Sequence, residues 1–326
     1  MSGVISGAIA ALIERVIGMA KSVEIQSWKE AVTFRFIPDW IAIGFLWCIA
    51  QLPYALLRRF GEGCGVLAYT LARKRCHIVR VNIALCFPEK APAEREELVK
   101  QCIKENIVGV FESAYAWWGK PERLKAQIDV IGQENIQNAV ARGKGVLLVG
   151  AHYSNLDLGG ALISYCVPID VTYRRHNNPL FDYFIRTRRA RFFDHIIERS
   201  ALRSMLKGLK KGRVLWYAAD QDYGTKHSVF APFFGIEAAT LNSTAKLVQM
   251  TGAAVVFVGH HRKSDGRFEL EFSPILENFP RGDDCTDAAL INEGLERQIR
   301  KFPEQYMWVH RRFKTQQHEK KGHFYR

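Results

Sequence analysis

The spacing of hydrophobic residues changes near residue 145, and this change divides the chain into two parts. Before it, apolar side chains recur at helical spacing, for example in PAEREELVKQCIKENIVGVFESAYAWW at 92–118. After it, short apolar runs such as GVLLVG, IDVTYR, HIIE, RVLWYAA and AAVVFVG alternate with helical stretches. This alternation predicts an α/β fold, an αβα sandwich with a largely parallel central sheet. The run RFELEFS adds a strand that we expect to be antiparallel.

The most apolar segment of the chain is 37–57, IPDWIAIGFLWCIAQLPYALL. A helix that spans a bilayer needs about 20 apolar residues, and Asp39, Gln51 and Pro53 interrupt this one. We therefore expect an N-terminal hydrophobic membrane helix at 37–59 that either spans the bilayer or lies in its interface. A helix buried in the protein core is the alternative.

The other boundaries follow from this segment. Residues 1–36 form an N-terminal extension, and the first 25 of them fit an amphipathic surface helix as well as a frayed end. Residues 60–315 form the main domain, and 316–326 form a polar tail. Arginine and lysine residues follow the apolar segment on its C-terminal side, which favours a cytosolic position for the main domain.

The composition indicates an anionic partner and a reducing environment. The net charge is +13 with an isoelectric point near 9.5, which suits nucleic acid, an anionic membrane or an acidic protein or substrate, unless the protein is simply a basic enzyme. No zinc-finger spacing or RNA-binding signature is present, so we expect no nucleic-acid partner. The seven cysteines are scattered and form no CxxC pair, which predicts reduced thiols and no structural zinc.

Two stretches share the spacing His-x4-Asp, a pattern that can join an imidazole to a carboxylate. They are His152 to Asp157 in GAHYSNLD and His260 to Asp265 in GHHRKSDG. With 10 His and 33 Asp plus Glu in 326 residues, about one His-x4-Asp/Glu match is expected by chance, so the spacing alone decides nothing.

The surroundings of the two motifs distinguish them. His152 follows a strand and Asp157 opens a helix, which is the corner where α/β enzymes place their chemistry. Asp265-Gly266 lies between two strands and is typical of a hairpin turn. We therefore predict that His152 is a general base and that Asp157, favoured by the helix dipole, orients its ring. No G-x-S-x-G motif supplies a serine nucleophile, so a substrate hydroxyl is expected to attack an acyl donor directly.

Several longer blocks resemble a known family. VGAHYSNLDLG resembles the His-x4-Asp/Glu block of glycerolipid-type acyltransferases. NIALCFPE, YRRHNNPLFDY, KKGRVLWYAADQDYGTKHSVFAPFFG and PEQYMWVHRRFKT resemble the late acyltransferases of lipid A biosynthesis, in their lauroyl-type branch. The likeness runs from about the apolar segment to Thr315, and Asp157 stands where relatives often have Glu.

The resemblance implies an enzyme of the bacterial inner membrane whose catalytic domain faces the cytoplasm. It implies transfer of a fatty acyl chain, lauroyl or similar, from acyl carrier protein to the 3-hydroxyl of an acyl chain on a Kdo2-lipid IVA-type precursor. It implies no cofactor and no metal. Basic clusters at 73–75, 207–213 and 311–314 are expected to meet either anionic lipid or the acidic carrier protein, although such clusters are often only solvated surface.

The resemblance assigns roles to two further residues, Arg189 and Asp220, and the chemistry and position of Arg174 and Asp222 add two more. Strong roles in the family fall on Arg189 and Asp220, and RTRRAR offers other arginines beside Arg189. We expect Arg189 and Arg174 to hold phosphate groups of the acceptor or donor. Asp220 and Asp222 are expected to bind sugar hydroxyls or to order Arg189, with a divalent metal as the less favoured alternative.

Two other functions remain open from the sequence. Acyl transfer to glycerophosphate or lysophospholipid uses the same dyad, but that class usually carries a glycine-threonine-arginine block where this chain has DQDYG. A non-catalytic protein that binds a membrane surface is the alternative outside enzymes. Transfer assays distinguish all three.

Overall fold

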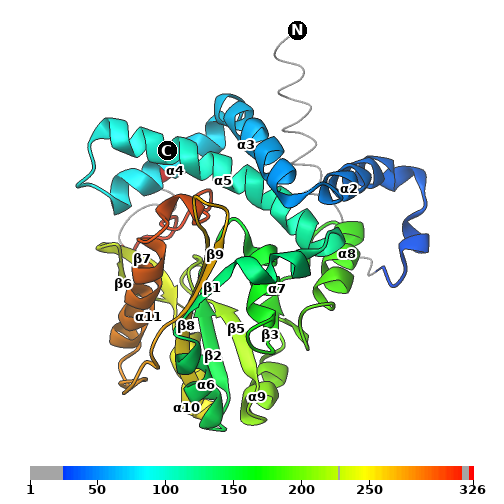
Figure 1. Ribbon diagram of the computed structural model, residues 1–326. Coiled ribbons are helices and arrows are strands. Elements are labelled where there is room, and N and C mark those ends of the chain that lie inside the picture. Colours follow the sequence, from blue (N-terminus) through cyan, green and yellow to red (C-terminus); the bar gives the residue numbers. More distant parts are fainter. Residues whose placement is uncertain (1–24, 227, 318–322) are drawn as a thin grey trace.

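The computed structural model describes residues 25–226, 228–317 and 323–326, and it shows one α/β body beneath a layer of N-terminal helices (Figure 1). The amphipathic helix expected in the first 25 residues falls on 1–24 and so lies outside the described part.

A seven-stranded sheet forms the centre, in the order β1-β9-β8-β2-β5-β3-β4. Strands β8, β2, β5, β3 and β4 are parallel neighbours, whereas β9 runs antiparallel to β8 and pairs in parallel with β1. The largely parallel sheet and the antiparallel RFELEFS strand are therefore confirmed. The strands are β1 Ile128–Ile131, β2 Val146–Gly150, β3 Asp170–Tyr173, β4 Ile196–Glu198, β5 Val214–Ala218, β8 Ala254–Arg262 and β9 Phe268–Phe272.

Helices cover both faces of this sheet, because its central strands are apolar on both sides. All five residues of β2 are buried. Leu147 and Val149 pack in one cluster with residues of α9, α10 and α11, and Val146 and Leu148 pack in another with residues of α6 and α7. This is the predicted αβα sandwich. The helices are α6 Gln133–Ala141, α7 Leu156–Ser164, α8 Pro179–Arg189, α9 Leu202–Lys210, α10 Ser243–Thr251 and α11 Asp284–Ile299.

The N-terminal part is helical, as predicted, and the 27-residue α5 packs against the other three helices of this layer. The single helix expected at 37–59 is two helices instead, because the first ends at Ala50 and the second begins after Pro53. The first has 14 residues, about 21 Å at 1.5 Å per residue. The helices are α2 Ile37–Ala50, α3 Tyr54–Leu71, α4 Arg73–Cys86 and α5 Pro92–Trp118, with short 3₁₀ turns at Trp28–Ala31, Phe34–Phe36, Pro121–Gln127, Pro303–Gln305 and His323–Tyr325.

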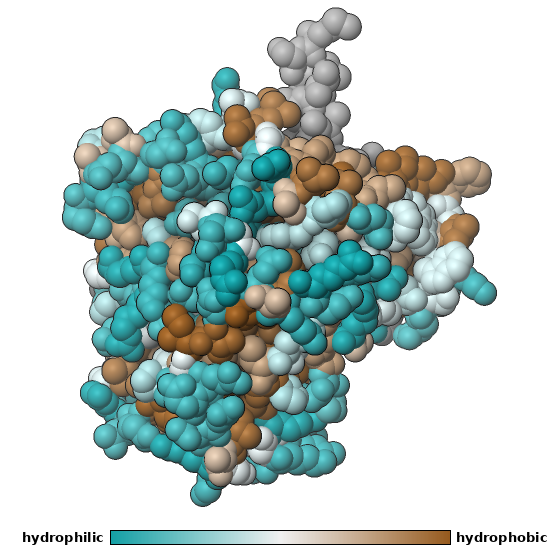
Figure 2. Space-filling view, viewed as in Figure 1, coloured by the Kyte–Doolittle hydropathy of each residue, from teal (hydrophilic) through white to brown (hydrophobic). Residues whose placement is uncertain are grey.

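No helix in the described ranges is both long and apolar enough to cross a membrane. The spanning form of the expected helix is therefore not found there. Instead, α2, α3 and the turns before them expose large apolar side chains, and these form a hydrophobic surface beside α2 (Figure 2). The most exposed are Phe34, Ile41, Val66, Val32 and Leu67.

A separate two-stranded hairpin was not predicted. Strands β6 Ser228–Phe233 and β7 Ile236–Leu241 pair antiparallel and pack against α11. Their two-residue turn is Phe234-Gly235, and both residues have positive φ, 52° and 76°. Glycine is favoured where φ is positive, so a glycine between two short apolar runs is a sequence signal of a hairpin turn.

Candidate active site

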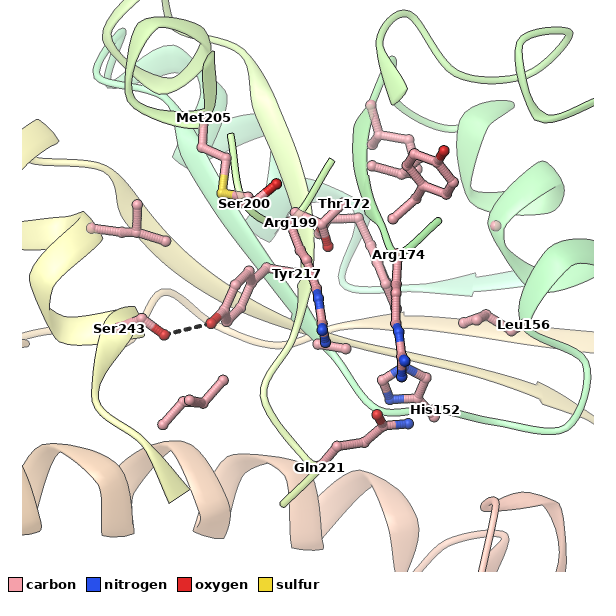
Figure 3. A pocket seen from close by; sticks show the side chains of 18 of the residues that line it. His152, Leu156, Thr172, Arg174, Arg199, Ser200, Met205, Tyr217, Gln221 and Ser243 are labelled. Carbon is pink, nitrogen blue, oxygen red and sulfur yellow. Dashed lines mark hydrogen bonds between the residues drawn. The ribbon is translucent and has the colours of Figure 1, made fainter. Parts of the chain in front are cut away.

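Four neighbouring parallel strands each deliver one polar side chain just beyond their carboxyl end. His152 follows β2, Arg174 follows β3, Arg199 follows β4 and Asp220 follows β5. Figure 3 shows Arg174 and Arg199 extending toward His152 and Gln221. The sheet order places these ends side by side, so residues far apart in sequence form one site.

His152 is bound to Asp220. The distance from His152 Nδ1 to Asp220 Oδ1 is 2.6 Å, and the backbone N–H of His152 donates to Asp220 Oδ2 at 3.0 Å. An ionised carboxylate only accepts hydrogen bonds, so Nδ1 carries the proton and Nε2 keeps a free lone pair. The side chain of His152 is 20% exposed, so its free nitrogen can meet a substrate.

The Asp220 carboxyl is strongly acidic in this setting. Burial alone would raise its pKa, but the charge and the hydrogen bonds of His152 outweigh burial, with a further contribution from Tyr306, and lower the pKa to about 2. Asp220 is therefore ionised at neutral pH and can stabilise a positive imidazolium on His152.

Asp157 does not have the partner that the sequence predicted. Its carboxylate accepts two hydrogen bonds from Arg189, from Nε at 2.6 Å and from Nη2 at 3.2 Å. The expected contact between Asp157 and His152 is thus replaced by the contact between Asp220 and His152. The expected ordering of Arg189 by Asp220 or Asp222 is replaced by Asp157.

The helix positions of this second pair explain its stability. Asp157 lies in the first turn of α7, as predicted, and Arg189 is the last residue of α8, so each charge suits its helix dipole. Burial would lower the pKa of Arg189, but Asp157 more than offsets this and the pKa lies above its usual value. Both side chains line the same cavity as His152.

The structure separates the arginines of RTRRAR. Arg186 binds Asp182 and the carbonyl of Ile25, and Arg191 donates to the carbonyl of Trp117. Among the arginines of this run, only Arg189 lines the cavity.

Of the other two expected binding residues, Arg174 lines the cavity and Asp222 does not. Asp222 accepts hydrogen bonds from the backbone and hydroxyl of Thr315 at 2.8 and 3.0 Å, and from the N–H of Gly224 at 2.8 Å. Its oxygens already accept three hydrogen bonds from the protein, so this geometry gives no support to the expected binding of sugar hydroxyls, which stays a prediction. Asp222 holds the C-terminal segment beside the site.

That C-terminal segment forms one wall of the site. Its backbone pairs with the loop of His152: the N–H of Met307 donates to the His152 carbonyl at 2.9 Å and that of Ser154 to the Gln305 carbonyl at 2.8 Å. His310 lines the cavity, its ring centre 6.3 Å from that of His152. Sequence reasoning used this block only as a family likeness and missed Tyr306 and His310. It also missed Arg199, although Arg199 follows a predicted strand as His152 does.

The second His-x4-Asp stretch is a hairpin, as predicted. Asp265 lies in the turn between β8 and β9 and accepts from the N–H of Arg267 at 2.9 Å. His260 lies within β8, is 1% exposed, and has Nδ1 3.0 Å from Asn155 Oδ1. Its contact with Asn155 therefore supports the loop that follows His152. The helix α7 comes so close that a Cβ on Gly159 would lie 2.1 Å from this ring.

A cavity of about 860 Å³ opens beside His152. Pockets of 300–1,000 Å³ commonly bind small ligands in proteins. Arg174, Arg199 and Gln221 lie near His152, and Met205, Tyr217 and Ser243 lie toward the other side of the view (Figure 3). Apolar side chains make up much of the wall, including Leu202, Met205, Trp216, Leu247 and Met250.

None of the seven cysteines lines this cavity, and all seven are free thiols. Three of them, Cys76, Cys86 and Cys102, are buried, and burial is the first cause that raises the pKa of each thiol. A thiol with a raised pKa is a weak nucleophile at neutral pH. The site therefore offers a base and a cavity but no cysteine nucleophile.

A carboxylate-bound histidine beside a cavity with largely apolar walls, at the carboxyl ends of parallel strands, is typical of an α/β enzyme that acts on a lipid-like substrate. Comparison with known proteins identifies the family within this class. A family model described as bacterial lipid A biosynthesis acyltransferase matches residues 24–315.

Curated relatives agree with the family model. The chain is 40% identical to the lipid A biosynthesis lauroyltransferase of Escherichia coli strain K12, over 86% of this chain and 92% of that protein. It is 38% identical to the lipid A biosynthesis palmitoleoyltransferase of the same strain, over 88% and 94%. A crystal structure of the 1-acyl-sn-glycerophosphate acyltransferase of Thermotoga maritima is similar at a TM-score of 0.34 and 15% identity, over 76% of this chain and 95% of that one, which is too distant to inform the site.

The chain belongs to the bacterial lipid A biosynthesis acyltransferase family. It is an acyltransferase, and the predicted family is confirmed.

Proposed function

We propose that this enzyme transfers a fatty acyl chain from the thioester of acyl carrier protein to the 3-hydroxyl of an acyl chain on a Kdo2-lipid IVA-type precursor. The observation that carries the proposal is the pairing of His152 with Asp220 beside the cavity. Relatives named lauroyltransferase and palmitoleoyltransferase support the kind of group that is moved.

The chemistry follows from the free lone pair on His152. Nε2 takes the proton of the acceptor hydroxyl while the oxygen attacks the thioester carbonyl carbon. A C–O bond forms, the tetrahedral intermediate collapses, and the C–S bond breaks. The imidazolium returns the proton to the leaving thiolate, so proton and electron pairs balance. Asp220 keeps the ring in the required tautomer and stabilises its positive charge.

The arginines have two different roles in this proposal. Arg174 and Arg199 are exposed at the cavity and bind phosphate groups of the acceptor or of the donor's phosphopantetheine arm. Arg189 is held by Asp157 and is 18% exposed, so it shapes the cavity wall next to the reacting atoms. This assigns Arg189 and Asp157 as positioning residues.

The membrane supplies the acceptor. The exposed apolar side chains of α2, α3 and the preceding turns suit insertion into the bilayer interface, where a lipid precursor resides. We place the enzyme at the inner membrane with its catalytic domain on the cytoplasmic side, where basic residues meet anionic lipid.

A transfer assay tests this function. Purified protein should acylate Kdo2-lipid IVA from an acyl carrier protein thioester, detected as one added chain by mass spectrometry. His152→Ala should lose nearly all kcat, whereas His77→Ala, which changes an exposed histidine on α4, should retain it. No transfer, equal transfer to glycerophosphate, or a trapped acyl-cysteine would contradict the proposal.

A further inference from the structure

The helix α9 carries two opposite faces with different chemistry. Leu202 and Met205 line the reaction cavity. Arg203, Lys207, Lys210 and the adjoining Lys211 stand at positions i, i+4, i+7 and i+8 and are exposed. Residues at these spacings share one side of a helix, so four cations form a stripe on the side away from the cavity. We call these four residues the α9 stripe.

The side chains of the α9 stripe are unpaired in the part of the chain that the structure describes. In the ranges that the structure describes, none of its four side chains pairs with a carboxylate, and α9 contains no acidic residue. Exposed cations on other helices do pair at helical spacing, such as Arg58 with Glu62 and Arg297 with Glu293. Four unpaired like charges repel one another, so the stripe favours an anionic partner.

A second cavity, of about 470 Å³, lies against the stripe. Lys207, Lys211, Arg213 and His195 line it, and Glu198 is the one acidic residue in its lining. The buried carboxylate of Asp170 holds Arg213 and His195 in place, with Oδ2 3.0 Å from Arg213 Nε and Oδ1 2.9 Å from His195 Nδ1. The stripe therefore borders a hollow with fixed donors, in which acidic side chains of a partner can sit.

The position of the stripe favours a soluble partner over the membrane. Most of the large apolar side chains that are exposed lie on α2, α3 and the turns before them, whereas α9 lies at the opposite end of the molecule (Figure 1) and exposes one such side chain, Leu202. A flat bilayer that contacts α2 cannot also reach α9. A compact acidic protein can approach from that side while the membrane occupies the other.

We propose that the α9 stripe docks the acidic carrier protein that presents the acyl thioester. This inference rests on the proposed function, because it takes the donor to be carrier-bound. Arg199 lies between the docked carrier and His152: it is exposed, lines the reaction cavity, and stacks on Tyr223 with its guanidinium carbon 5.2 Å from the ring centre. It binds the phosphodiester of the pantetheine arm as the arm enters.

The test compares two donors in the intact protein in detergent. One donor is the acyl carrier protein thioester, and the other is the same acyl chain on coenzyme A, which has the pantetheine arm but no carrier. Lys207→Glu/Lys211→Glu reverses half of the stripe. Lys120→Glu/Arg281→Glu makes the same change of charge at two exposed positions away from α9.

The stripe variant should lower kcat/KM for the carrier-bound donor by at least about ten-fold and leave the coenzyme A donor within about two-fold. It should also reduce the dependence of the carrier reaction on salt, because fewer charges attract the partner. The control variant should change neither donor. Thermal unfolding of both variants checks that they remain folded.

Other outcomes are decisive in different ways. Equal loss with both donors, or no loss with the carrier donor, would overturn the docking surface and leave the proposed function standing. Weaker binding to anionic vesicles without a change in donor use would assign the stripe to the membrane instead. If the wild type transfers from coenzyme A but not from carrier protein, the proposed donor fails and the docking inference fails with it.

Discussion

At the scale of single residues, His152 and Asp157 are only five positions apart but belong to different pairs. The register of the sheet explains this. Gly150 of β2 pairs with Ala218 of β5, so the residues two positions beyond each strand, His152 and Asp220, come together. A motif spacing describes only one loop, whereas this contact depends on which strands are neighbours.

The Asp157–Arg189 pair should behave as one unit. Asp157→Asn or Arg189→Met leaves the other charge largely buried without its partner, so each single change is costly. The double variant should recover part of this loss, with a coupling energy of about 1–3 kcal/mol. Thermal unfolding and KM measured on all four proteins check the prediction. Strictly additive losses would show that the two side chains act independently.

Part of the candidate site was therefore accessible from sequence. The strand-end rule located His152 and would have located Arg199, since both follow apolar runs. The partner of His152 required the order of β2 and β5, which are separated in the chain by two other strands. Asp222 also follows a strand, but its oxygens face Thr315, 93 residues away, and no local pattern signals that contact.

At the scale of elements, β8 is a buried strand that contains two neutral histidines. Burial lowers the pKa of both His260 and His261 to about 3. In the unfolded chain such groups bind a proton below about pH 6.5. The unfolded state therefore holds more protons between pH 6.5 and 3, and the free energy of unfolding falls as the pH drops through this window.

We expect each of these histidines to lower the free energy of unfolding by about 1.4 kcal/mol for each pH unit below pH 6.5. His261→Phe removes one of them and keeps a ring to stack on Phe302, whose centre lies 4.6 Å from that of His261. Urea unfolding at pH 7.5, 6.5 and 5.5 should show a shallower pH dependence in this variant. The same slope in variant and wild type would refute a neutral, buried His261.

The end of β8 also anchors the N-terminal helices. The buried guanidinium of Arg262 binds two carboxylates of α5, Glu105 and Glu112, and Tyr54 of α3 donates to Glu112 at 2.5 Å. Arg262→Met would leave two carboxylates buried without a cation and should lower the free energy of unfolding by about 3–5 kcal/mol.

The control for Arg262 lies in the same hairpin. Arg267 pairs with Asp129 at the surface, so Arg267→Met should have little effect on denaturant unfolding. If both variants lose equal stability, the buried cluster is not what holds the helical layer to the sheet.

The predicted helices and strands agree with the structure where the hydrophobic periodicity is strong. The 27-residue α5 and the apolar strands of the sheet were predicted because their patterns are long or fully apolar. The segment at 37–57 was harder, since its apolar residues continue across Pro53 while the helix does not. The β6/β7 hairpin was missed because its signal is a two-residue turn that begins with a phenylalanine.

At the scale of the whole molecule, two surfaces have opposite character. One end exposes apolar side chains on α2, α3 and the turns before them, and the other carries the α9 stripe (Figures 1 and 2). The reaction cavity lies between them, at the carboxyl ends of the parallel strands. Under the proposed function, this arrangement would let a membrane lipid and a soluble donor reach His152 from different sides.

The apolar end should bind membranes. Phe34 is 92% exposed and Ile41 is 68% exposed, and each large apolar side chain gains about 1.5–3 kcal/mol when fully buried. Phe34→Ser/Ile41→Ser should weaken binding to anionic phospholipid vesicles at least about ten-fold in a sedimentation assay. Ile131→Ser/Val140→Ser, which changes exposed apolar residues on β1 and α6, should bind as the wild type does. Equal binding by all three proteins would place the membrane contact elsewhere.

The proposed mechanism depends on Asp220 as the partner of His152, the proposed general base. The most direct test is the pH–rate profile of kcat/KM for acyl transfer, measured for the wild type, Asp220→Asn and Asp157→Asn. Asp220→Asn should lower the rate by about 10²–10⁴-fold and move the acidic limb to lower pH, because the imidazolium loses its stabilising carboxylate. Asp157→Asn should lower the rate without moving that limb, and Asp157→Glu should restore most of it. A shifted limb in Asp157→Asn together with an unshifted limb in Asp220→Asn would contradict the account.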